Sequence, residues 1–496
     1  MSNPRAERAT NVTLDALAAD FTARLGGESV VTERAALRTY ECDGLAAYRC
    51  VPGLVVLPAT TDDVAYVVRR CHESGIPFVA RGAGTGLSGG ALPREDGVLI
   101  VMSRMSRIRE VDVDDQRAVV EPGAINLDVT RAASSEDFYY APDPSSQQVC
   151  SIGGNVAENS GGAHCLKYGF TVNHVTGLEV VMPDGSVETF GGRAPDPPGY
   201  DLIGAFVGSE GTLGIATEVT VRLLRKPETV QTLLAGFRTM DDAGRAVSDL
   251  IAAGVLPAAV EMMDALAIEA AEAAVGCGYP AGAGAVLIVE LDGPVAEVET
   301  HLAAVDEFCR GAGAFEIRVA EDDVQRVQIW RGRKSAFAAV GRISPDYIVQ
   351  DGVIPRTALP EVLRQIASLS TESGVRVANV FHAGDGNLHP LVLFDDSREG
   401  EATRAEEVSG AIIDLCITHG GSITGEHGVG ADKAKFMPRM FTDEDLDTMQ
   451  LVRCAFDPDS ISNPGKVFPT PRLCGERPGR HQGVHQLAEA GVAEVF

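Results

Sequence analysis

Two short polar stretches contain the residues best suited to chemistry. The stretch FHAGDGNLHP places His382 and His389 on either side of an Asp-Gly pair. Such a pair between apolar residues predicts a β-hairpin, and side chains on its facing strands lie about 5 Å apart. The stretch GSITGEHGVG adds the carboxylate of Glu426 and the imidazole of His427 on a glycine-flanked loop. These four side chains are the first candidates for a reaction centre.

Two histidines and one glutamate, with one position left open, form a ligand set of catalytic zinc sites. His382, His389 and Glu426 are therefore candidate ligands of one divalent cation. Neither segment matches a standard zinc-binding pattern, so a polar hairpin beside an unrelated glycine-rich loop is the alternative. Spacing alone leaves both interpretations open.

The overall composition predicts a soluble, multidomain protein without a nucleic-acid partner. At 496 residues the chain is too long for one hydrophobic core, which predicts two or three domains. Its 42 basic and 70 acidic residues give a net charge of -28, and a surface of that sign repels nucleic acid. The sequence shows neither a signal-peptide pattern nor a run that could span a membrane, and its cysteines form no CxxC pair. We expect a cytoplasmic protein with reduced thiols.

Residues 1 to about 50 have a mostly helical pattern, and from residue 53 strands and helices alternate. Apolar residues at 54–59 predict a strand, and Thr61 is expected to cap a helix that buries its i, i+3, i+4, i+7 face. A strand at 76–80 then runs directly into the loop RGAGTGLSGGA. This loop contains GxGxxG, but the strand GVLIVM follows it instead of the helix that a Rossmann pyrophosphate site requires. A nicotinamide-dependent dehydrogenase is therefore excluded.

Three glycine-rich loops occur in the first half of the chain. They are RGAGTGLSGGA at 81–91, SIGGNVAENSGG at 151–162 and GSEGTLGI at 208–215. Glycine allows the backbone to approach a ligand closely, and successive N–H groups in such loops form anion-binding nests. Separated by short strands, the three loops fit one long ligand with a pyrophosphate, such as a dinucleotide. Plain structural turns in a strand-rich domain are the alternative.

After residue 227 alanine-rich helical patterns alternate with strands, which predicts an α+β domain. The expected helices are 241–253 and 264–274, and the expected strands are 284–291 and 315–320. The stretch WRGRKSAF is expected to open a further helix and carries Arg331, Arg333 and Lys334. In so acidic a chain these cations are candidates for a carboxylate clamp, although a basic helix face is usually only solvated.

The order of these motifs resembles that of the FAD-linked oxidoreductases of the vanillyl-alcohol-oxidase superfamily, and within it the D-2-hydroxy-acid dehydrogenase branch. That branch includes the FAD subunit of glycolate oxidase and the D-lactate and D-2-hydroxyglutarate dehydrogenases. The resemblance covers about residues 40–470. It rests on eight motifs: RGAGTGLSGG, PDPSS, GGNVAENSGG, GSEGTLGI, WRGRKSAF, HAGDGNLH, GEHGVG and NPGKVF.

The resemblance implies an α+β fold. It consists of a two-subdomain FAD-binding domain of the p-cresol methylhydroxylase (PCMH) type and an α+β cap domain with an antiparallel sheet. The expected segments are an N-terminal helical wrap at 1–50, the FAD-binding domain at 51–227, the cap or substrate domain at 228–435, a C-terminal return to the FAD domain at 436–470 and a disordered tail at 471–496.

By the same resemblance the glycine loops hold FAD. The first loop would wrap its pyrophosphate, the second would line the cofactor, the third would hold its adenine side or centre, and Asn463 would approach the isoalloxazine. Thr85 stands in the region where some relatives carry a flavin-linked histidine, so FAD is expected to be noncovalent. The implied FAD-binding residues are Arg81, Gly82, Ala83, Gly84, Thr85, Gly86, Gly89, Gly90, Pro142, Asp143, Ser145, Gly153, Gly154, Asn155, Asn159, Ser160, Gly161, Gly162, Gly211, Ile215 and Asn463.

The resemblance also assigns the reacting residues. His382, His389 and Glu426 would be ligands of a divalent metal, with zinc expected, and His427 would be the catalytic base. Arg333 would bind the carboxylate of a small D-2-hydroxy acid, whose hydroxyl proton passes to His427 while a hydride moves from Cα to the flavin. Glu426 and His427 can serve one site only where flanking glycines make the backbone irregular, because neighbours in a strand point to opposite faces.

Glycolate or D-lactate is the favoured substrate. Relatives specific for diacids carry a lysine shortly before an aspartate that resembles Asp351, and the segment YIVQDG contains no cation. D-2-hydroxyglutarate is the alternative substrate. Because the sequence carries no second redox centre, the expected acceptor is a quinone or a protein, such as an iron–sulfur partner subunit, a cytochrome or an electron-transfer flavoprotein. We further expect a homodimer or a hetero-oligomer, in the cytoplasm or peripherally at the inner face of the membrane.

Two other functions are weighed against the dehydrogenase. Alkylglycerone-phosphate synthase shares FAD and a histidine-rich site but exchanges an acyl for an alkyl group without net oxidation. A non-catalytic FAD-holding subunit would only assemble a complex. The GDGN hairpin together with GEHGVG favours the dehydrogenase over the synthase, and the intact set His382, His389, Glu426 and His427 argues against a non-catalytic subunit.

Overall fold

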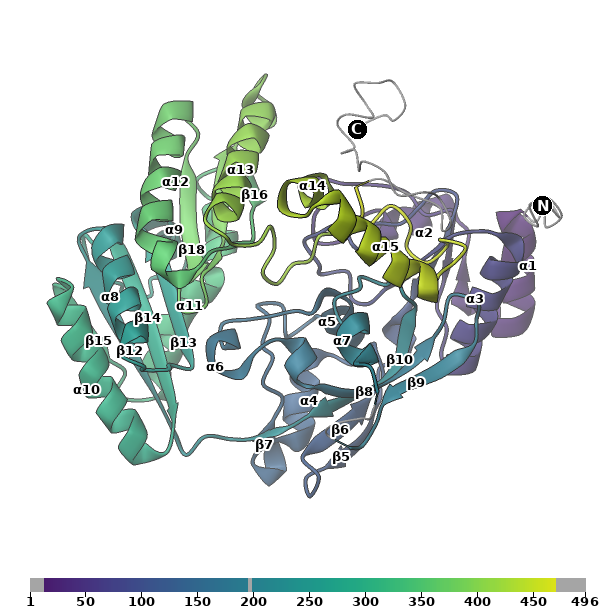
Figure 1. Ribbon diagram of the computed structural model, residues 1–496, viewed down its shortest axis with the longest axis horizontal. Coiled ribbons are helices and arrows are strands. Elements are labelled where there is room, and N and C mark those ends of the chain that lie inside the picture. The colour runs from purple at the N-terminus through teal and green to yellow at the C-terminus, as the bar shows by residue number, and fades with distance from the viewer. Residues whose placement is uncertain (1–12, 195–198, 470–496) are drawn as a thin grey trace. The chain divides into compact units, whose positions relative to one another are not determined.

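The computed structural model describes residues 13–194 and 199–469, which form two compact units (Figure 1). Unit 1 comprises 1–161, 170–225 and 426–496, and unit 2 comprises 162–169 and 226–425. The tail expected at 471–496 and the first part of the expected N-terminal wrap, 1–12, lie outside the described residues. Within the described ranges every helix is too short or too polar to cross a membrane. Both units combine helices with sheets, so the predicted α+β class is confirmed.

Unit 1 contains a mixed sheet and an antiparallel sheet, each with its own buried core. Its strands are β1 (Val30–Val31), β2 (Leu54–Val56), β3 (Phe78–Arg81), β4 (Val98–Val101), β5 (Ile108–Asp112), β6 (Arg117–Val120), β7 (Phe138–Tyr139), β8 (Val175–Val181), β9 (Val187–Gly191), β10 (Ile215–Arg222) and β11 (Leu224–Arg225). The mixed sheet has the order β1-β2-β4-β3, with β4 parallel to both of its neighbours. The antiparallel sheet has the order β5-β6-β10-β8-β9, and β11 pairs with β7.

The described α-helices of unit 1 have between 4 and 14 residues. They are α1 (Leu14–Leu25), α2 (Arg34–Leu37), α3 (Thr61–Ser74), α4 (Asn126–Ala133), α5 (Ile152–Glu158), α7 (Leu202–Phe206), α14 (Met437–Met440) and α15 (Asp443–Phe456). The inward face predicted for α3 is buried at Val64, Val67, Val68 and Cys71. Its N-cap, however, is Thr60 and not Thr61, because the Thr60 hydroxyl accepts a hydrogen bond from Asp63 N–H. Turns, rather than a helix, connect β3 to β4.

Unit 2 is built on one large antiparallel sheet. Its strands are β12 (Thr229–Phe237), β13 (Ala259–Asp264), β14 (Ala285–Gly293), β15 (Glu316–Val319), β16 (Asp346–Val349), β17 (Gly352–Val353), β18 (Val377–His382), β19 (Asn387–Leu388) and β20 (Pro390–Phe394). Its helices are α6 (Cys165–Tyr168), α8 (Met240–Ala252), α9 (Ala265–Val275), α10 (Val295–Gly311), α11 (Asp323–Val340), α12 (Leu359–Ser373) and α13 (Glu401–Thr418). The strand order is β15-β12-β14-β13-β18-β19-β17, with β20 bridging β18 and β16. The antiparallel sheet expected for the cap is thus present.

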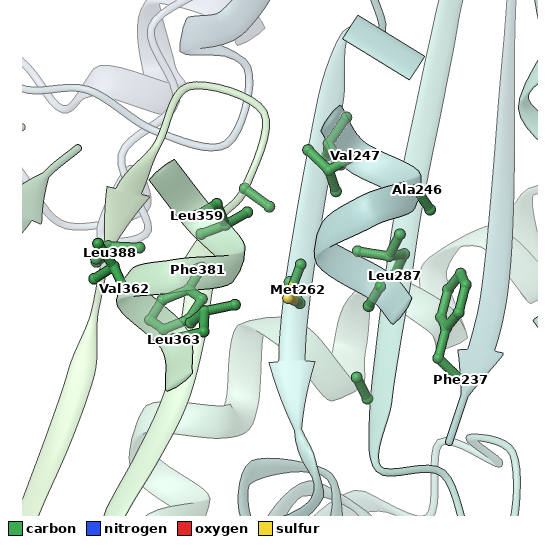
Figure 2. Close-up of a cluster of buried hydrophobic side chains, with 14 of the residues drawn as sticks. Phe237, Ala246, Val247, Met262, Leu287, Leu359, Val362, Leu363, Phe381 and Leu388 are labelled. Carbon is green, nitrogen blue, oxygen red and sulfur yellow. The ribbon is translucent and has the colours of Figure 1, made fainter. Parts of the chain in front are cut away.

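Alternation along these strands separates two hydrophobic clusters, one on each face of the sheet. On β14, Leu287 and Val289 belong to the first cluster, while Val286 and Ile288 belong to the second. The first cluster packs against α8, α10, α12 and α13, and Figure 2 shows strand side chains such as Phe237 and Met262 among those of α8 and α12. The second cluster packs against α9 and α11.

Three buried polar residues occupy strand positions whose side chains point to the same face of the sheet as the second cluster. Glu261 alternates with Ala259 and Met263 on β13, Glu290 follows the same pattern on β14, and His382 does so on β18. The alternation therefore directs all three side chains toward the face that α9 and α11 cover.

The helix α11 corrects one expectation. WRGRKSAF was expected to open a helix, but α11 begins at Asp323, seven residues before Trp330. The Asp322 carboxylate caps it by accepting a hydrogen bond from Gln325 N–H at 2.8 Å. WRGRKSAF therefore occupies the middle of the helix, where Trp330 and Arg333 lie one turn apart and are both buried.

Two N-cap aspartates of unit 2 give a stability prediction. The buried Asp264 caps α9 through Ala267 N–H and also accepts hydrogen bonds from the backbone and side-chain amides of Asn379, whereas Asp322 is exposed. We expect Asp264→Ala to lower the free energy of unfolding by about 2–4 kcal/mol, because buried donors lose their acceptor, and Asp322→Ala by about 1 kcal/mol. Urea unfolding followed by fluorescence of the single tryptophan, Trp330, measures both. Equal losses of unfolding free energy in the two variants would show that burial of the cap residue is not the cause.

Candidate active site

The predicted histidine hairpin is present in unit 2. Strand β18 ends at His382, a turn follows at 383–386, and His382 pairs with Asn387 on the returning strand. The rings of His382 and His389 lie 5.0 Å apart between centroids, and both side chains are almost fully buried. Their ligand-type nitrogens lie within 4.8 Å of each other. The hairpin thus brings the two imidazoles close enough to share one ion.

Glu261 is hydrogen-bonded to one of these histidines. Its Oε1 lies 2.6 Å from His382 Nδ1, and the two residues are register partners on β13 and β18. A carboxylate on Nδ1 fixes the proton there and leaves Nε2 as the nitrogen suited to a metal. Burial raises the pKa of Glu261, but the charge of Arg333 and the hydrogen bonds from His382 and Arg333 outweigh burial and hold that pKa below its ordinary value.

Arg333 reaches the same carboxylate from α11. Its Nε donates to Glu261 Oε2 at 2.6 Å, and its side chain is 4% exposed. Its Nη2 is buried and has no hydrogen-bond partner among the described residues. A buried guanidinium nitrogen without an acceptor is costly, which fits a position that an anionic ligand completes. The predicted carboxylate-binding residue is therefore held by a partner that the sequence did not reveal.

The segment before Glu426 is fastened to Asp351 within unit 2. The fully buried Asp351 accepts hydrogen bonds at Oδ2 from Thr424 Oγ1 at 2.6 Å and from Gly425 N–H at 3.1 Å. Its Oδ1 lies 3.4 Å from His389 Nε2. Asp351 therefore connects a histidine of the hairpin with the residue that directly precedes Glu426 in the chain.

Glu426 and His427 are the first residues of the last segment of unit 1. The backbone bends at 425–427, and Gly428 has a φ of 89°, so the irregular backbone expected here is present. His427 Nε2 lies 3.8 Å from Glu426 Oε1, with both side chains mostly buried. The two neighbouring side chains therefore approach each other, which a regular strand would not allow.

Glu210, in the third glycine loop, anchors the backbone that follows His427. Its carboxylate accepts hydrogen bonds from Val429 N–H at 2.6 Å and from Gly430 N–H at 2.7 Å. Burial raises the pKa of Glu210 to about 7, although both N–H groups favour the charged form. The loop is thereby fixed to the domain that carries the glycine-rich segments.

All residues expected to bind FAD lie in unit 1 except Gly162, which belongs to unit 2. The first two loops are joined by Ala83 N–H, which donates to Ser151 Oγ at 3.3 Å. The C-terminal return is joined to the first and third loops by the Asn463 amide, which donates to Gly90 O at 2.9 Å and Glu210 O at 2.6 Å. The buried Asn463 Oδ1 has no hydrogen-bond partner among the described residues, which leaves an acceptor for a bound group.

The PDPSS segment joins the same assembly through a residue that the sequence did not single out. Asn126 Nδ2 donates to Pro142 O at 3.1 Å and to Asn155 Oδ1 at 3.0 Å. Ser145 is exposed and Asp143 is half-buried. Unit 1 therefore collects the glycine loops, PDPSS and NPGKVF into one hydrogen-bonded body that fits a long cofactor.

Two glycine substitutions separate cofactor approach from protein packing. A Cβ on Gly86 would meet Glu158 Oε1 at 3.7 Å as its nearest atom beyond the adjacent residues, whereas a Cβ on Gly82 would lie 2.2 Å from Ser151 Oγ. We expect Gly86→Ala to leave the stability of the apoprotein unchanged and to weaken FAD binding about tenfold, the effect of a methyl group forced into close packing. Gly82→Ala should lower both the stability of the apoprotein and its affinity for FAD. Flavin retention after gel filtration and thermal unfolding of the apoprotein test this, and unchanged FAD affinity in Gly86→Ala would show that the cofactor does not approach there.

Sequence reasoning missed Glu261 and Glu210. A signal for the first existed, since AVEMMD places Glu261 between the apolar residues Val260 and Met262 of a mostly apolar strand, where the carboxylate must find a buried partner. No comparable signal marked Glu210, because its partners are backbone groups more than two hundred positions away along the chain.

Comparison with known proteins shows the family of the chain. Residues 52–191 match the family model of the FAD binding domain, and residues 226–467 match that of the FAD linked oxidases, C-terminal domain. Glycolate oxidase subunit GlcD of Escherichia coli is 53% identical over 442 residues, 89% of each chain. The mitochondrial D-lactate dehydrogenase [cytochrome] of Arabidopsis thaliana is 30% identical over 427 residues, 86% of this chain and 74% of that protein.

A solved structure shows the same fold at low sequence identity. p-Cresol methylhydroxylase with substrate bound superposes with a TM-score of 0.77 at 17% identity, covering 92% of this chain and 98% of that one. The chain therefore belongs to the FAD-linked oxidases with a PCMH-type FAD-binding fold, and it is an FAD-dependent hydroxy-acid oxidoreductase.

Proposed function

We propose that this protein oxidises glycolate or D-lactate to the 2-oxo acid. One observation carries the proposal: two imidazoles and a guanidinium with an unsatisfied nitrogen are gathered in one buried region of unit 2. A 2-hydroxy acid carries a carboxylate and a hydroxyl on adjacent carbons. In our proposal Arg333 Nη2 binds the carboxylate, and the two imidazoles would hold a cation that would polarise the hydroxyl.

The residues present fit a divalent cation. His382 and His389 offer nitrogens within 4.8 Å of each other, and a buried carboxylate holds the proton on His382 Nδ1. Glu426 is the third proposed ligand. It directly follows Gly425, whose N–H donates to Asp351, and Asp351 also lies next to His389. We propose that His382, His389 and Glu426 bind the ion, with zinc expected from two nitrogens and one carboxylate.

The chain's own residues divide the remaining work. When bound, FAD takes up the electron pair that leaves the substrate Cα, and the cation lowers the pKa of the α-hydroxyl. His427 accepts the hydroxyl proton at Nε2, the nitrogen that faces Glu426, since imidazole exchanges protons near neutral pH. Glu210 holds the backbone beyond His427, and burial of His382 and His389 keeps water from the reacting hydroxyl.

A monoacid is preferred over D-2-hydroxyglutarate. A second carboxylate would need its own cation, and the segment 347–352 that leads into Asp351 contains none. We expect kcat/KM for glycolate or D-lactate to exceed that for D-2-hydroxyglutarate in steady-state assays with an artificial electron acceptor. A larger value for the diacid than for both monoacids would refute the substrate assignment.

The acceptor, assembly and location belong to the same proposal. Because the sequence has no cysteine cluster for a second redox centre, electrons pass to a quinone or to a protein, such as an iron–sulfur partner subunit. FAD is bound noncovalently, since Thr85 offers no nucleophilic imidazole. We place the protein in the cytoplasm as a homodimer or hetero-oligomer, with peripheral contact at the inner membrane face where a quinone is the acceptor.

A further inference from the structure

Glu261 connects the proposed cation site with the proposed carboxylate site. It is the acidic residue of β13 that faces α11, and its side chain has no exposed surface. One carboxylate oxygen accepts from Arg333 Nε and the other lies beside His382 Nδ1, both at 2.6 Å. A single carboxylate thus holds two side chains that come from different elements of unit 2, α11 and β18.

The geometry fixes both partners at the same time. A desolvated carboxylate between two strong donors cannot turn toward water, so neither donor can move without losing a charge-assisted hydrogen bond. The His382 ring keeps its proton on Nδ1, and the plane of the Arg333 guanidinium is held by its Nε. Glu261 consequently sets the distance between His382 Nε2, the nitrogen suited to a metal, and Arg333 Nη2.

We propose that Glu261 is a positioning residue that selects acids whose hydroxyl lies on the carbon next to the carboxylate. This proposal rests on the proposed function of His382 and Arg333. An α-hydroxyl and its carboxylate are separated by one carbon–carbon bond, whereas a β-hydroxyl lies one carbon further away. A fixed spacing between the two binding groups accepts the first and rejects the second, because a misplaced polar group leaves a buried partner unsatisfied.

The neighbouring strand provides a matched control. Glu290 on β14 is also buried on this face, and it also accepts from an arginine of α11, Arg326, at 2.9 Å and lies 3.2 Å from a histidine, His164. Trp330 Nε1 donates to it as well, at 2.6 Å. None of these partners belongs to the proposed cation or carboxylate site, so Glu290→Gln removes a comparable buried charge without touching the spacing.

The experiment compares isomeric acids on the full-length, FAD-loaded protein. We expect Glu261→Gln to lower the ratio of kcat/KM for D-lactate to that for its isomer 3-hydroxypropionate at least about tenfold, since an amide can accept from only one of the two donors. The loss for D-lactate should lie mainly in KM. Glu261→Asp, which keeps the charge but shortens the side chain, should lower the same ratio, and it provides a second variant where the first folds poorly.

A readout that is independent of activity accompanies the kinetics. We expect Glu261→Gln to weaken zinc binding by about 10–100-fold, measured by competition with a chelator, because the partner of a metal-binding imidazole is lost. Glu290→Gln should leave both the isomer ratio and the zinc affinity unchanged even where it lowers the melting temperature.

Three results would overturn the proposal. An unchanged isomer ratio in both folded Glu261 variants, with zinc bound and D-lactate oxidised by the wild type, refutes the positioning role and leaves the proposed function intact. Equal effects of Glu261→Gln and Glu290→Gln show that Glu261 acts only through stability. Absence of zinc binding in the wild type refutes the proposed cation site and this inference together.

Discussion

Replacing His427 by alanine leaves FAD bound and slows flavin reduction by D-lactate about 10²–10⁴-fold, the usual contribution of a general base. The rate falls because no other group accepts the hydroxyl proton as the substrate is oxidised. FAD stays bound because Glu210 holds the backbone N–H groups of Val429 and Gly430, which the substitution does not alter. Anaerobic stopped-flow absorbance of the flavin measures the rate, and the absorbance ratio of flavin to protein measures retention.

A histidine outside the site is the control for this substitution. His419, at the end of α13, lies 3.4 Å from Gln365 Oε1 in unit 2 and takes no part in the proposed reaction. His419→Ala should reduce its flavin at the wild-type rate. A wild-type rate in His427→Ala would contradict the assignment of the base, whereas loss of FAD from that variant would assign a structural role to the histidine.

Replacing His382 by alanine removes the bound cation and lowers kcat/KM for D-lactate about 10³-fold or more, since Lewis-acid activation supplies several kcal/mol. Three protein ligands are the minimum of a catalytic zinc site, so two hold the ion poorly. Metal analysis of the purified protein measures the bound cation, and steady-state kinetics measure kcat/KM for D-lactate. Chelator treatment of the wild type should reproduce the loss, and added zinc should restore activity to the wild type alone.

The control for the metal prediction is His301→Ala on α10, which should keep metal content and activity. In His382→Ala we expect metal content and activity to fall together. Full activity in a metal-free His382→Ala protein would show that the cation has no part in the reaction.

Local features of this fold could be predicted from the sequence because they depend on neighbouring residues. The inward face of α3, the histidine hairpin and the irregular backbone beside Glu426 all follow from short patterns. The errors are local as well: Thr60 rather than Thr61 caps α3, since two adjacent threonines offer the same hydroxyl, and α11 begins at Asp323 because Asp322 supplies a cap.

The long-range contacts of the site could not be predicted in this way. The resemblance assigns Arg333 to the substrate carboxylate but does not reveal Glu261, which holds Arg333 from a strand 72 positions earlier in the chain. Glu210 meets the loop after His427 across 219 positions. Which strand a helix covers depends on sheet order, and no single segment of the sequence records that order. The buried carboxylates that organise the site therefore became visible only in the fold.

The most direct test of the central claim is an anaerobic titration of the FAD-loaded protein, with the flavin absorbance followed as hydroxy acid is added. We expect glycolate or D-lactate to bleach the flavin of the zinc-loaded protein, and the same acid to leave the flavin of chelator-treated protein oxidised. Bleaching that is equally fast with and without the metal would contradict a role of the metal in the reaction. A flavin that neither acid reduces would contradict the proposed oxidation of glycolate or D-lactate.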